Sequence, residues 1–530
     1  MYASEDLMVY SLLFLLILPS IAGVFLENRN WWYDAIIYGR HSIDSYQSLY
    51  SGSLNTWFGS MFTRYSQKPP LLIWIGQCFV PLGVFLGPVR KGLLFTPIVL
   101  SFLTVFISYI AFKRMFDDKL IALAGAVFIS SSPMFIGLST CFYTEPLLLL
   151  VVAWFTYVYA SHLSWDRYYA LLHLLSVFFV SLLTKFSGPF YLILPSIIIL
   201  HYVFRRGFFW FFMELRQTAA KHTGMAAVTT ALFLVTTGLY LQNISNYVFH
   251  AEKSLSGKWV LQQTFVESTA RLLRASAGVF FLDYSLLSFL IIALAGLFLL
   301  RKTGGVGENH HVVVFPLQIL LVLLVIGYFQ LKDPWRFVFP VLPYVAAIMC
   351  WSLRIIGRKT VTILAIVVFL FQAVLLHSYA FGILQSRHSN PFLTDIFVRP
   401  YLTKYSQPEV ISDYYRLLDV LCNRSTQDTV LMIPGKNEGI GIVRNALILY
   451  SNSEYSDNCQ FIDYPRKNEN YLARAANGTD HLAVIYESYA DPNEKKNRPL
   501  FDEFKSCRLM NLDGYKNIRS ISENITIKLC

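Results

Sequence analysis

Ionisable side chains interrupt the apolar segments of this sequence at five places where a charge is costly. Charges at or near membrane depth are rare and usually mark a functional site. Two of the five are acids and three are bases. In the topology predicted from the basic residues, all five fall at the outer ends of apolar segments. They are Asp34 in WWYDAIIYGR, Lys68 in RYSQKPPLLIW, Glu145 in CFYTEPLLLL, Lys185 in LLTKFSGP and Arg336 in KDPWRFVFPVLP.

This set of residue types suits the transfer of a group away from a phosphate. A carboxylate can take the proton of an incoming hydroxyl or amine, while Lys and Arg hold the departing phosphate and neutralise its charge. No nucleotide reaches the outer face of a membrane, so the phosphate would belong to a lipid. The alternative interpretation is a set of independent, solvated loop charges, which would also lie at the outer ends of spans.

The composition is that of a polytopic membrane protein. Of the 530 residues, 55% are hydrophobic, 16% are aromatic and only 15% are charged. Apolar runs recur at the length of about 20 residues that a bilayer core requires. The first run, residues 7–26, follows Glu5 and Asp6 and no basic segment, so we expect a retained span. The net charge of +11 reflects Lys and Arg beside the spans, and no nucleic-acid surface is expected.

The distribution of basic residues predicts the topology. The run PPLLIWIGQCFVPLG is too short to cross a bilayer, and we expect it to lie along the outer surface as an interfacial helix. With the N-terminus inside, four basic clusters then face the cytoplasm, as the positive-inside rule requires. These clusters are Lys113–Arg114, Arg205–Arg206, Arg301–Lys302 and Arg354–Arg358–Lys359.

The predicted fold class is therefore an α-helical polytopic membrane protein with about 11 transmembrane helices, each of roughly 20 residues. The expected spans are residues 7–26, 92–112, 119–138, 141–160, 168–186, 188–204, 224–242, 280–300, 312–331, 336–354 and 360–380. They form a transmembrane domain, residues 1–382, with outer-loop and juxtamembrane helices at about 27–90.

Residues 383–530 are polar and mixed, and we expect them to form a small α/β domain outside the cytoplasm. The segments DTVLMIPG and HLAVIYES are typical of strands, and GIGIVRNALILYS between them is typical of a helix. This tail holds four of the seven cysteines in a compartment that permits disulfides, although four unpaired thiols are the alternative. The cysteines are Cys422, Cys459, Cys507 and Cys530.

Several motifs occur in the order and spacing of a known family. DAIIY begins at Asp34, after the first span, and KPPLLIW begins 34 residues later at Lys68. SSPMFIGLSTCFYTEPLLLL, LLTKFSGPFYLILP and RFVFPVLPY follow further along the chain. Over roughly residues 7–350 this pattern resembles the GT-C glycosyltransferases of the protein O-mannosyltransferase type, which include the bacterial lipid A aminoarabinose transferases.

The resemblance implies a polyprenyl-phosphate-linked sugar as donor and direct displacement with inversion at the anomeric carbon. It assigns the catalytic carboxylate of the first outer loop to Asp34, and it offers Lys68 to the donor phosphate or to the acceptor. Lys185 and Arg336 would neutralise the leaving phosphate, and Glu145 would orient the acceptor or a cation. A carboxylate at a helix start such as Glu145 also gains from the helix dipole, which is its structural interpretation.

Two departures from the family pattern affect the expected cofactors. Ala35 follows Asp34 where the family often has Glu, and Gln67 precedes Lys68 where some relatives carry a metal-binding acid. We therefore expect no tightly bound catalytic metal, although a divalent cation remains an alternative. Tyr38 matches the family tyrosine but could equally be an interfacial aromatic. Arg64 is a candidate substrate contact, with contact to a lipid headgroup as the alternative.

The expected activity is thus a hexosyl or pentosyl transfer from a lipid-phosphate donor to a glycan, lipid or protein acceptor at the extracytoplasmic face. The bacterial inner membrane is favoured over the endoplasmic reticulum. A flippase or transporter of lipid-linked sugars is the alternative, although it would need charges distributed through the spans. A catalytically inactive relative is a further alternative.

Overall fold

The computed structural model describes the helical part of the chain and five strands of the tail. The described residues are 2–26, 31, 33–52, 54–63, 69–86, 89–205, 207, 211, 213–214, 219–253, 264, 266–267, 311–328, 334–381, 428–432, 459–463, 482–487, 508–509 and 525–529. The chain divides into two compact units. The first comprises Met1–Phe25, Gly52–Trp74 and Phe95–Lys404, and the second Leu26–Ser51, Ile75–Leu94 and Tyr405–Cys530.

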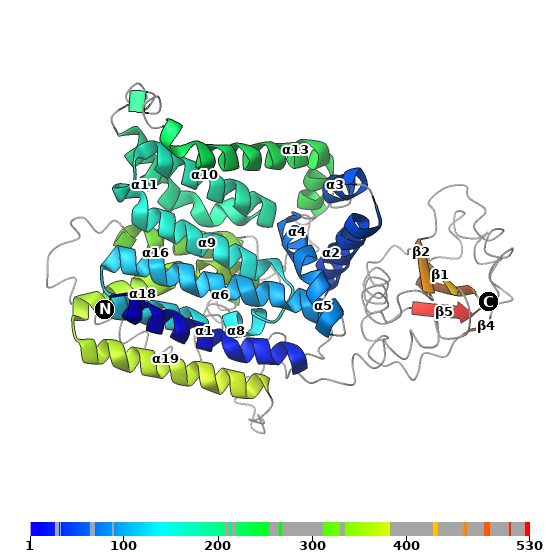
Figure 1. Ribbon diagram of the computed structural model, residues 1–530, viewed down its shortest axis with the longest axis horizontal. Coiled ribbons are helices and arrows are strands. Elements are labelled where there is room, and N and C mark those ends of the chain that lie inside the picture. Colours follow the sequence, from blue (N-terminus) through cyan, green and yellow to red (C-terminus); the bar gives the residue numbers. More distant parts are fainter. Residues whose placement is uncertain are drawn as a thin grey trace. The chain divides into compact units, whose positions relative to one another are not determined.

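Most of the first unit consists of long apolar helices that lie alongside one another (Figure 1). In chain order the α-helices of the protein are α1 Tyr2–Leu26, α2 Tyr33–Ser51, α3 Leu54–Thr63, α4 Leu71–Gly76, α5 Val80–Leu86, α6 Val89–Phe116, α7 Lys119–Ser130, α8 Pro133–Leu138, α9 Thr144–Ser161, α10 Arg167–Thr184, α11 Ile193–Phe204, α13 Thr223–Lys253, α16 His311–Tyr328, α17 Pro334–Val338, α18 Leu342–Ile356 and α19 Lys359–Ala380. The 3-10 helices are η1 Gln77–Phe79, η2 His162–Ser164, η3 Gly188–Leu192, η4 Ala219–His222 and η6 Phe339–Val341.

Seven helices of the described chain are long and apolar enough to cross a membrane, judged by length and composition. They overlap the spans expected at residues 7–26, 92–112, 141–160, 168–186, 224–242, 336–354 and 360–380. The apolar helices at Leu71–Gly83, Lys119–Ser130, Gly188–Phe204 and Val313–Ile326 are shorter. The interfacial placement of Leu71–Gly83 stays a prediction, and the span expected near 280–300 lies outside the described residues.

The span expected at residues 119–138 is divided into two helices. α7 ends at Ser130, and α8 begins at Pro133 after Ser131 and Ser132. The Ser132 hydroxyl accepts a hydrogen bond from the Phe135 N–H at 3.5 Å, and Pro133 occupies the first turn, where its missing N–H costs nothing. Hydropathy did not reveal this break, because only two serines separate the helices and the residues on both sides are mostly apolar.

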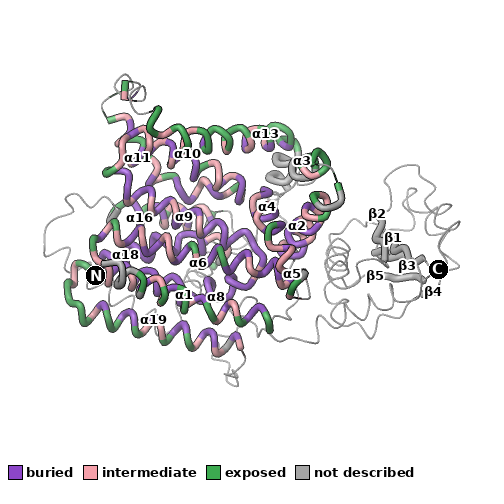
Figure 2. Tube along the Cα trace, viewed as in Figure 1, coloured by how far each residue is buried: buried purple, intermediate pink, exposed green. Residues whose placement is uncertain are grey.

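The interior of the first unit is built on α9 and α18, which are buried along most of their length, whereas α13 is largely exposed (Figure 2). Small residues and buried hydrogen bonds join the helices, as is usual where lipid supplies no hydrophobic drive for helix association. A Cβ atom at Gly125 of α7 would lie 2.5 Å from the Cys350 Sγ of α18. Ser20 of α1 shares a 2.8 Å hydrogen bond with Ser139, which follows α8.

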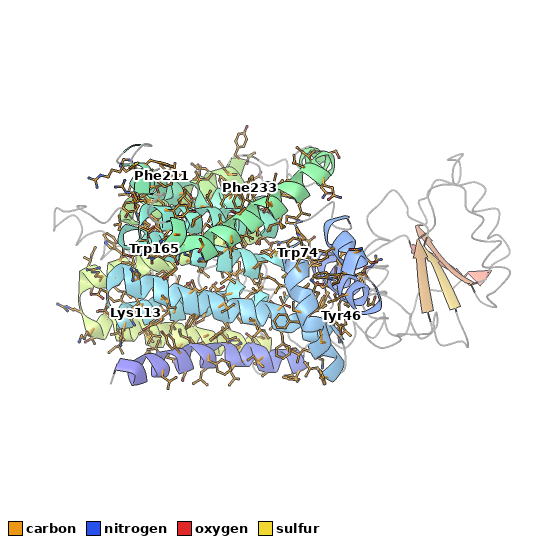
Figure 3. All side chains as sticks on the ribbon, turned by 45° about the horizontal axis from the view of Figure 1, so that its top comes forward. Tyr46, Trp74, Lys113, Trp165, Phe211 and Phe233 are labelled. Carbon is orange, nitrogen blue, oxygen red and sulfur yellow. The ribbon has the colours of Figure 1, made fainter. Side chains whose placement is uncertain are left out.

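The described residues of three predicted basic clusters lie at the same end of these helices. Arg114, in the last turn of α6, donates a hydrogen bond to Ser164, in the connection between α9 and α10. Tyr202, near the end of α11, donates to the Trp165 carbonyl at 2.8 Å. In Figure 3, Lys113 and Trp165 mark this end. The last turns of α18 reach it too, since the Cys350 thiol bonds to the Ile121 carbonyl near the start of α7. Arg301 and Lys302 lie outside the described residues.

The described strands of the second unit form one sheet of order β2-β1-β3-β5-β4. β1 pairs in parallel with β2 and β3, while β5 pairs antiparallel with β3 and β4. The strands are β1 Asp428–Met432, β2 Cys459–Asp463, β3 Leu482–Glu487, β4 Arg508–Leu509 and β5 Ile525–Leu529. β1 and β3 cover the two segments that the sequence predicts as strands. The predicted helix at residues 439–451 and the predicted cysteine pairing lie outside the described residues.

Candidate functional site

Glu145 is a fully buried carboxylate at the first turn of a central helix. Tyr143 is in extended conformation, and α9 begins at the next residue, which places Glu145 in the first helical turn. None of its side-chain surface is exposed. Burial of an unpaired ionised carboxylate is very costly, so a charge at this position requires partners of opposite charge.

Lys185 and Arg336 supply those partners, and both contact the same oxygen of Glu145. The Lys185 Nζ lies 3.0 Å from Glu145 Oε1, and the Arg336 Nε lies 2.7 Å from it. The hydroxyl of Thr144 makes a longer hydrogen bond, 3.4 Å, to Oε2. The sequence separations are 40 and 191 residues, so three different helical segments meet at this carboxylate. We call these three residues, Glu145, Lys185 and Arg336, the charged triad.

The two cations of the charged triad are only partly covered. The exposed fractions of the Lys185 and Arg336 side chains are 19% and 18%, compared with 0% for Glu145. The buried carboxylate therefore holds both cations by direct contact, while part of each cation remains accessible to a ligand. With one carboxylate and two cations, these three residues together carry one excess positive charge, which suits an anion such as a phosphate.

Two aromatic rings support the cations, and the sequence interpretation did not identify them. The Lys185 ammonium lies 4.7 Å from the centroid of the Phe337 ring, and the Arg336 guanidinium lies 5.0 Å from that of Tyr143. Such cation–π contacts stabilise a partly desolvated cation by roughly 0.5–2 kcal/mol. Their positions in the sequence could have indicated this role. Tyr143 lies two residues before Glu145, and Phe337 directly follows Arg336.

A tight turn presents Lys185 to the carboxylate. Lys185 ends α10 in extended conformation, and its N–H bonds to the Ser181 carbonyl at 3.0 Å. The chain then turns back, and the Gly188 N–H bonds to the Lys185 carbonyl at 2.8 Å. A Cβ atom at Gly188 would overlap the Ser181 carbonyl oxygen, so only glycine allows this close approach to the end of α10.

Substitution of Gly188 by Ala is expected to destabilise the protein and displace Lys185. The added methyl group meets backbone atoms, which cannot move as a flexible side chain could, and overpacking of this kind typically costs about 1–3 kcal/mol. The matched control is Gly238→Ala in α13, where no atom lies within 4 Å of the added Cβ and helix propensity improves. A thermal shift assay on both variants should show a lower Tm for Gly188→Ala alone, and equal Tm values would contradict the close approach.

Asp34 and Tyr38 lie on one face of a different helix. Asp34 is half-buried in the first turn of α2, in the second unit, and Tyr38 is buried one turn later. Residues four apart on a helix are neighbours on its surface. The Tyr38 carbonyl accepts a 2.9 Å hydrogen bond from the buried Ser42 hydroxyl. The assignment of Tyr38 to the substrate site stays a prediction.

The structure therefore brings together three of the predicted site residues, Glu145, Lys185 and Arg336. They are not separately solvated loop charges, since the carboxylate is fully buried and contacts both cations. Lys68 and Arg64, the other two predicted basic contacts, lie outside the described residues. Among the residues that are described, no group of three or more His, Cys, Asp or Glu side chains could hold a metal ion.

Comparison with known proteins identifies the fold. No family model matches the chain, and no curated protein sequence matches it. Two crystal structures of ArnT from Cupriavidus metallidurans do match. The structure bound to undecaprenyl phosphate aligns with a TM-score of 0.57 at 11% identity, covering 100% of this chain and 98% of ArnT. The apo structure aligns with a TM-score of 0.55 at 13% identity, with the same coverage. The chain thus has the polytopic membrane fold of ArnT, which confirms at the level of fold the GT-C resemblance seen in the sequence.

Proposed function

We propose that this protein is an integral-membrane glycosyltransferase that takes its sugar from a polyprenyl-phosphate donor. One observation carries the proposal: two partly exposed cations converge on one oxygen of the buried Glu145, at the end of the helices opposite Arg114. Such an arrangement suits a phosphate that arrives on a lipid. The ArnT structure with undecaprenyl phosphate shows that a protein of this fold holds a ligand of that class.

In the proposed reaction an acceptor hydroxyl or amine attacks the anomeric carbon of the donor sugar. The acceptor proton passes to the Asp34 carboxylate, a new bond forms to the anomeric carbon, and the bond from that carbon to the phosphate oxygen breaks. The electron pair of the broken bond remains on the phosphate, which gains a negative charge. Direct displacement inverts the anomeric configuration.

The charged triad stabilises the charge that develops on the leaving phosphate. Lys185 and Arg336 neutralise it at a site partly shielded from water, where electrostatic contacts are stronger than in solution. Glu145 holds the two cations in place. On the sequence resemblance, we assign Lys68, Tyr38 and Arg64 to substrate contacts. The reaction would take place at the extracytoplasmic face, in a bacterial inner membrane, with the tail domain on the same side.

Transfer by the purified protein in nanodiscs tests this proposal. The protein would be incubated with polyprenyl-phosphate hexoses and pentoses and a membrane extract as acceptor source. We expect release of the unglycosylated polyprenyl phosphate and a matching mass increase on an acceptor. Transfer should persist in EDTA, because Gln67 replaces a metal-binding acid. A donor that moves across a vesicle bilayer without being cleaved would instead identify a flippase.

A further inference from the structure

Tyr191 joins the two segments that carry the cations of the charged triad. It lies in η3, six residues after Lys185, and its hydroxyl donates a 2.8 Å hydrogen bond to the carbonyl of Phe337, the residue after Arg336. Phe337 is also the residue whose ring lies against the Lys185 ammonium. A single buried hydroxyl thus holds the backbone of Phe337, the residue that follows Arg336 and whose ring lies beside Lys185.

Tyr191 is itself held by a neighbouring helix. Its carbonyl accepts a 2.9 Å hydrogen bond from the hydroxyl of Tyr344 in α18. Tyr191 is 1% exposed and Tyr344 is fully buried. Buried polar groups are costly to leave without a partner, so these bonds resist displacement of η3.

Gln318 of α16 holds the same segment from another side. Its Nε2 donates to the Phe190 carbonyl at 3.0 Å, and its Oε1 accepts from the Leu194 N–H at 2.9 Å. An uninterrupted α-helix would join these two backbone groups directly, because they are four residues apart. The fully buried amide of Gln318 therefore bridges the change from η3 to α11 and keeps the segment in one conformation.

We propose that Tyr191 is a positioning residue, which sets Lys185 and Arg336 at the separation that the leaving phosphate requires. This inference rests on the proposed function, since it concerns the geometry of the same site. Without the Tyr191 hydroxyl the two segments can move relative to each other, although Glu145 still attracts both cations. The cations then meet the phosphate in a less well-defined arrangement.

The effect should appear in kcat more than in KM. The phosphodiester of the donor carries one negative charge in the ground state, and the phosphate gains a second as the bond to the sugar breaks. Interactions that strengthen only in the transition state raise kcat. Interactions that are equally strong with the bound substrate and the transition state change KM instead. Correct placement of both cations matters most when the second charge develops, so misplacement should spare ground-state binding.

Tyr191→Phe removes only the hydroxyl, and Tyr202→Phe is its matched control. Tyr202 also donates a 2.8 Å bond to a backbone carbonyl, that of Trp165, at the opposite end of the helices. We expect Tyr191→Phe to lower kcat about tenfold, in line with a lost buried hydrogen bond, and to change KM for the donor less than about threefold. Tyr202→Phe should retain kcat within about twofold, with a comparable fall in Tm.

A double-mutant comparison separates positioning from a general loss of packing. In an Arg336→Lys background the guanidinium geometry is already lost, so Tyr191→Phe should lower kcat by less than about twofold. The inference is overturned if Tyr191→Phe and Tyr202→Phe behave alike, or if the tenfold loss persists unchanged in the Arg336→Lys background. Failure of the wild-type protein to bind or use any polyprenyl-phosphate sugar would overturn the proposed function itself, and this inference with it.

Discussion

Asp34→Asn is expected to abolish turnover while leaving expression and donor binding nearly intact. Asparagine keeps the shape of the side chain but cannot accept the proton of the acceptor, and loss of a general base typically lowers a rate by about 10²–10⁴-fold. The half-buried position of Asp34 in the first turn of α2 is compatible with contact to a substrate. The measurement is sugar transfer from a polyprenyl-phosphate donor by the purified variant in nanodiscs.

Asp44→Asn is the matched control on the same helix. Asp44 lies 3.5 Å from Arg40 in an i,i+4 ion pair, and its side chain is 18% exposed. The substitution removes a carboxylate from α2 but no group assigned to the reaction, so activity should stay within about twofold of wild type. Activity of Asp34→Asn within a few-fold of wild type would remove Asp34 from the mechanism and make Glu145 the leading candidate for the base.

Glu145→Gln is expected to have the second largest effect, through the charged triad. Removal of the carboxylate leaves Lys185 and Arg336 side by side without the anion that holds both at 3.0 Å or less. Loss of one partner of a buried ion pair typically destabilises a protein by about 3–5 kcal/mol. The cations should also shift by an ångström or more, and displacement on that scale can lower kcat about 10²-fold.

The same variant should bind the donor at least as well as wild type, because the net charge of these three side chains rises from one to two positive charges. This combination distinguishes a positioning role from a base, whose removal would leave Tm unchanged. Glu214→Gln serves as control, since Glu214 is 30% exposed and lies 3.7 Å from Arg167 in a weaker pair. A Glu145→Gln protein with wild-type Tm and kcat would contradict the role assigned to the triad.

Seven of the eleven expected spans match helices long and apolar enough to cross a membrane, because their signal is local. A bilayer requires about 20 apolar residues of helix, and this requirement is satisfied within each segment separately. The strands β1 and β3 follow likewise from short β-branched and apolar runs between turn residues. The break between α7 and α8 was missed, since Ser131 and Ser132 are two small residues in an otherwise apolar run.

The candidate site was only partly predictable. Glu145, Lys185 and Arg336 were identified because charges beside apolar runs are costly, but their convergence on one oxygen depends on tertiary packing. Tyr191 and Gln318 gave no signal at all. Their hydrogen-bond partners are backbone groups of Phe337, Phe190 and Leu194, which become available only where the helices are interrupted.

Comparison of polyprenyl phosphate with the uncharged polyprenol tests most directly whether the charged triad is a lipid-phosphate site. Binding of both lipids would be measured by native mass spectrometry for wild type, for Lys185→Met/Arg336→Met, and for the control Lys221→Met, which changes a lysine that is 74% exposed. We expect wild type and the control to prefer the phosphate at least about tenfold, as two charge-assisted contacts imply, and the double variant to lose this preference. Equal binding of the two lipids by wild type, or an unchanged preference in a folded double variant, would contradict the assignment of the charged triad as a lipid-phosphate site.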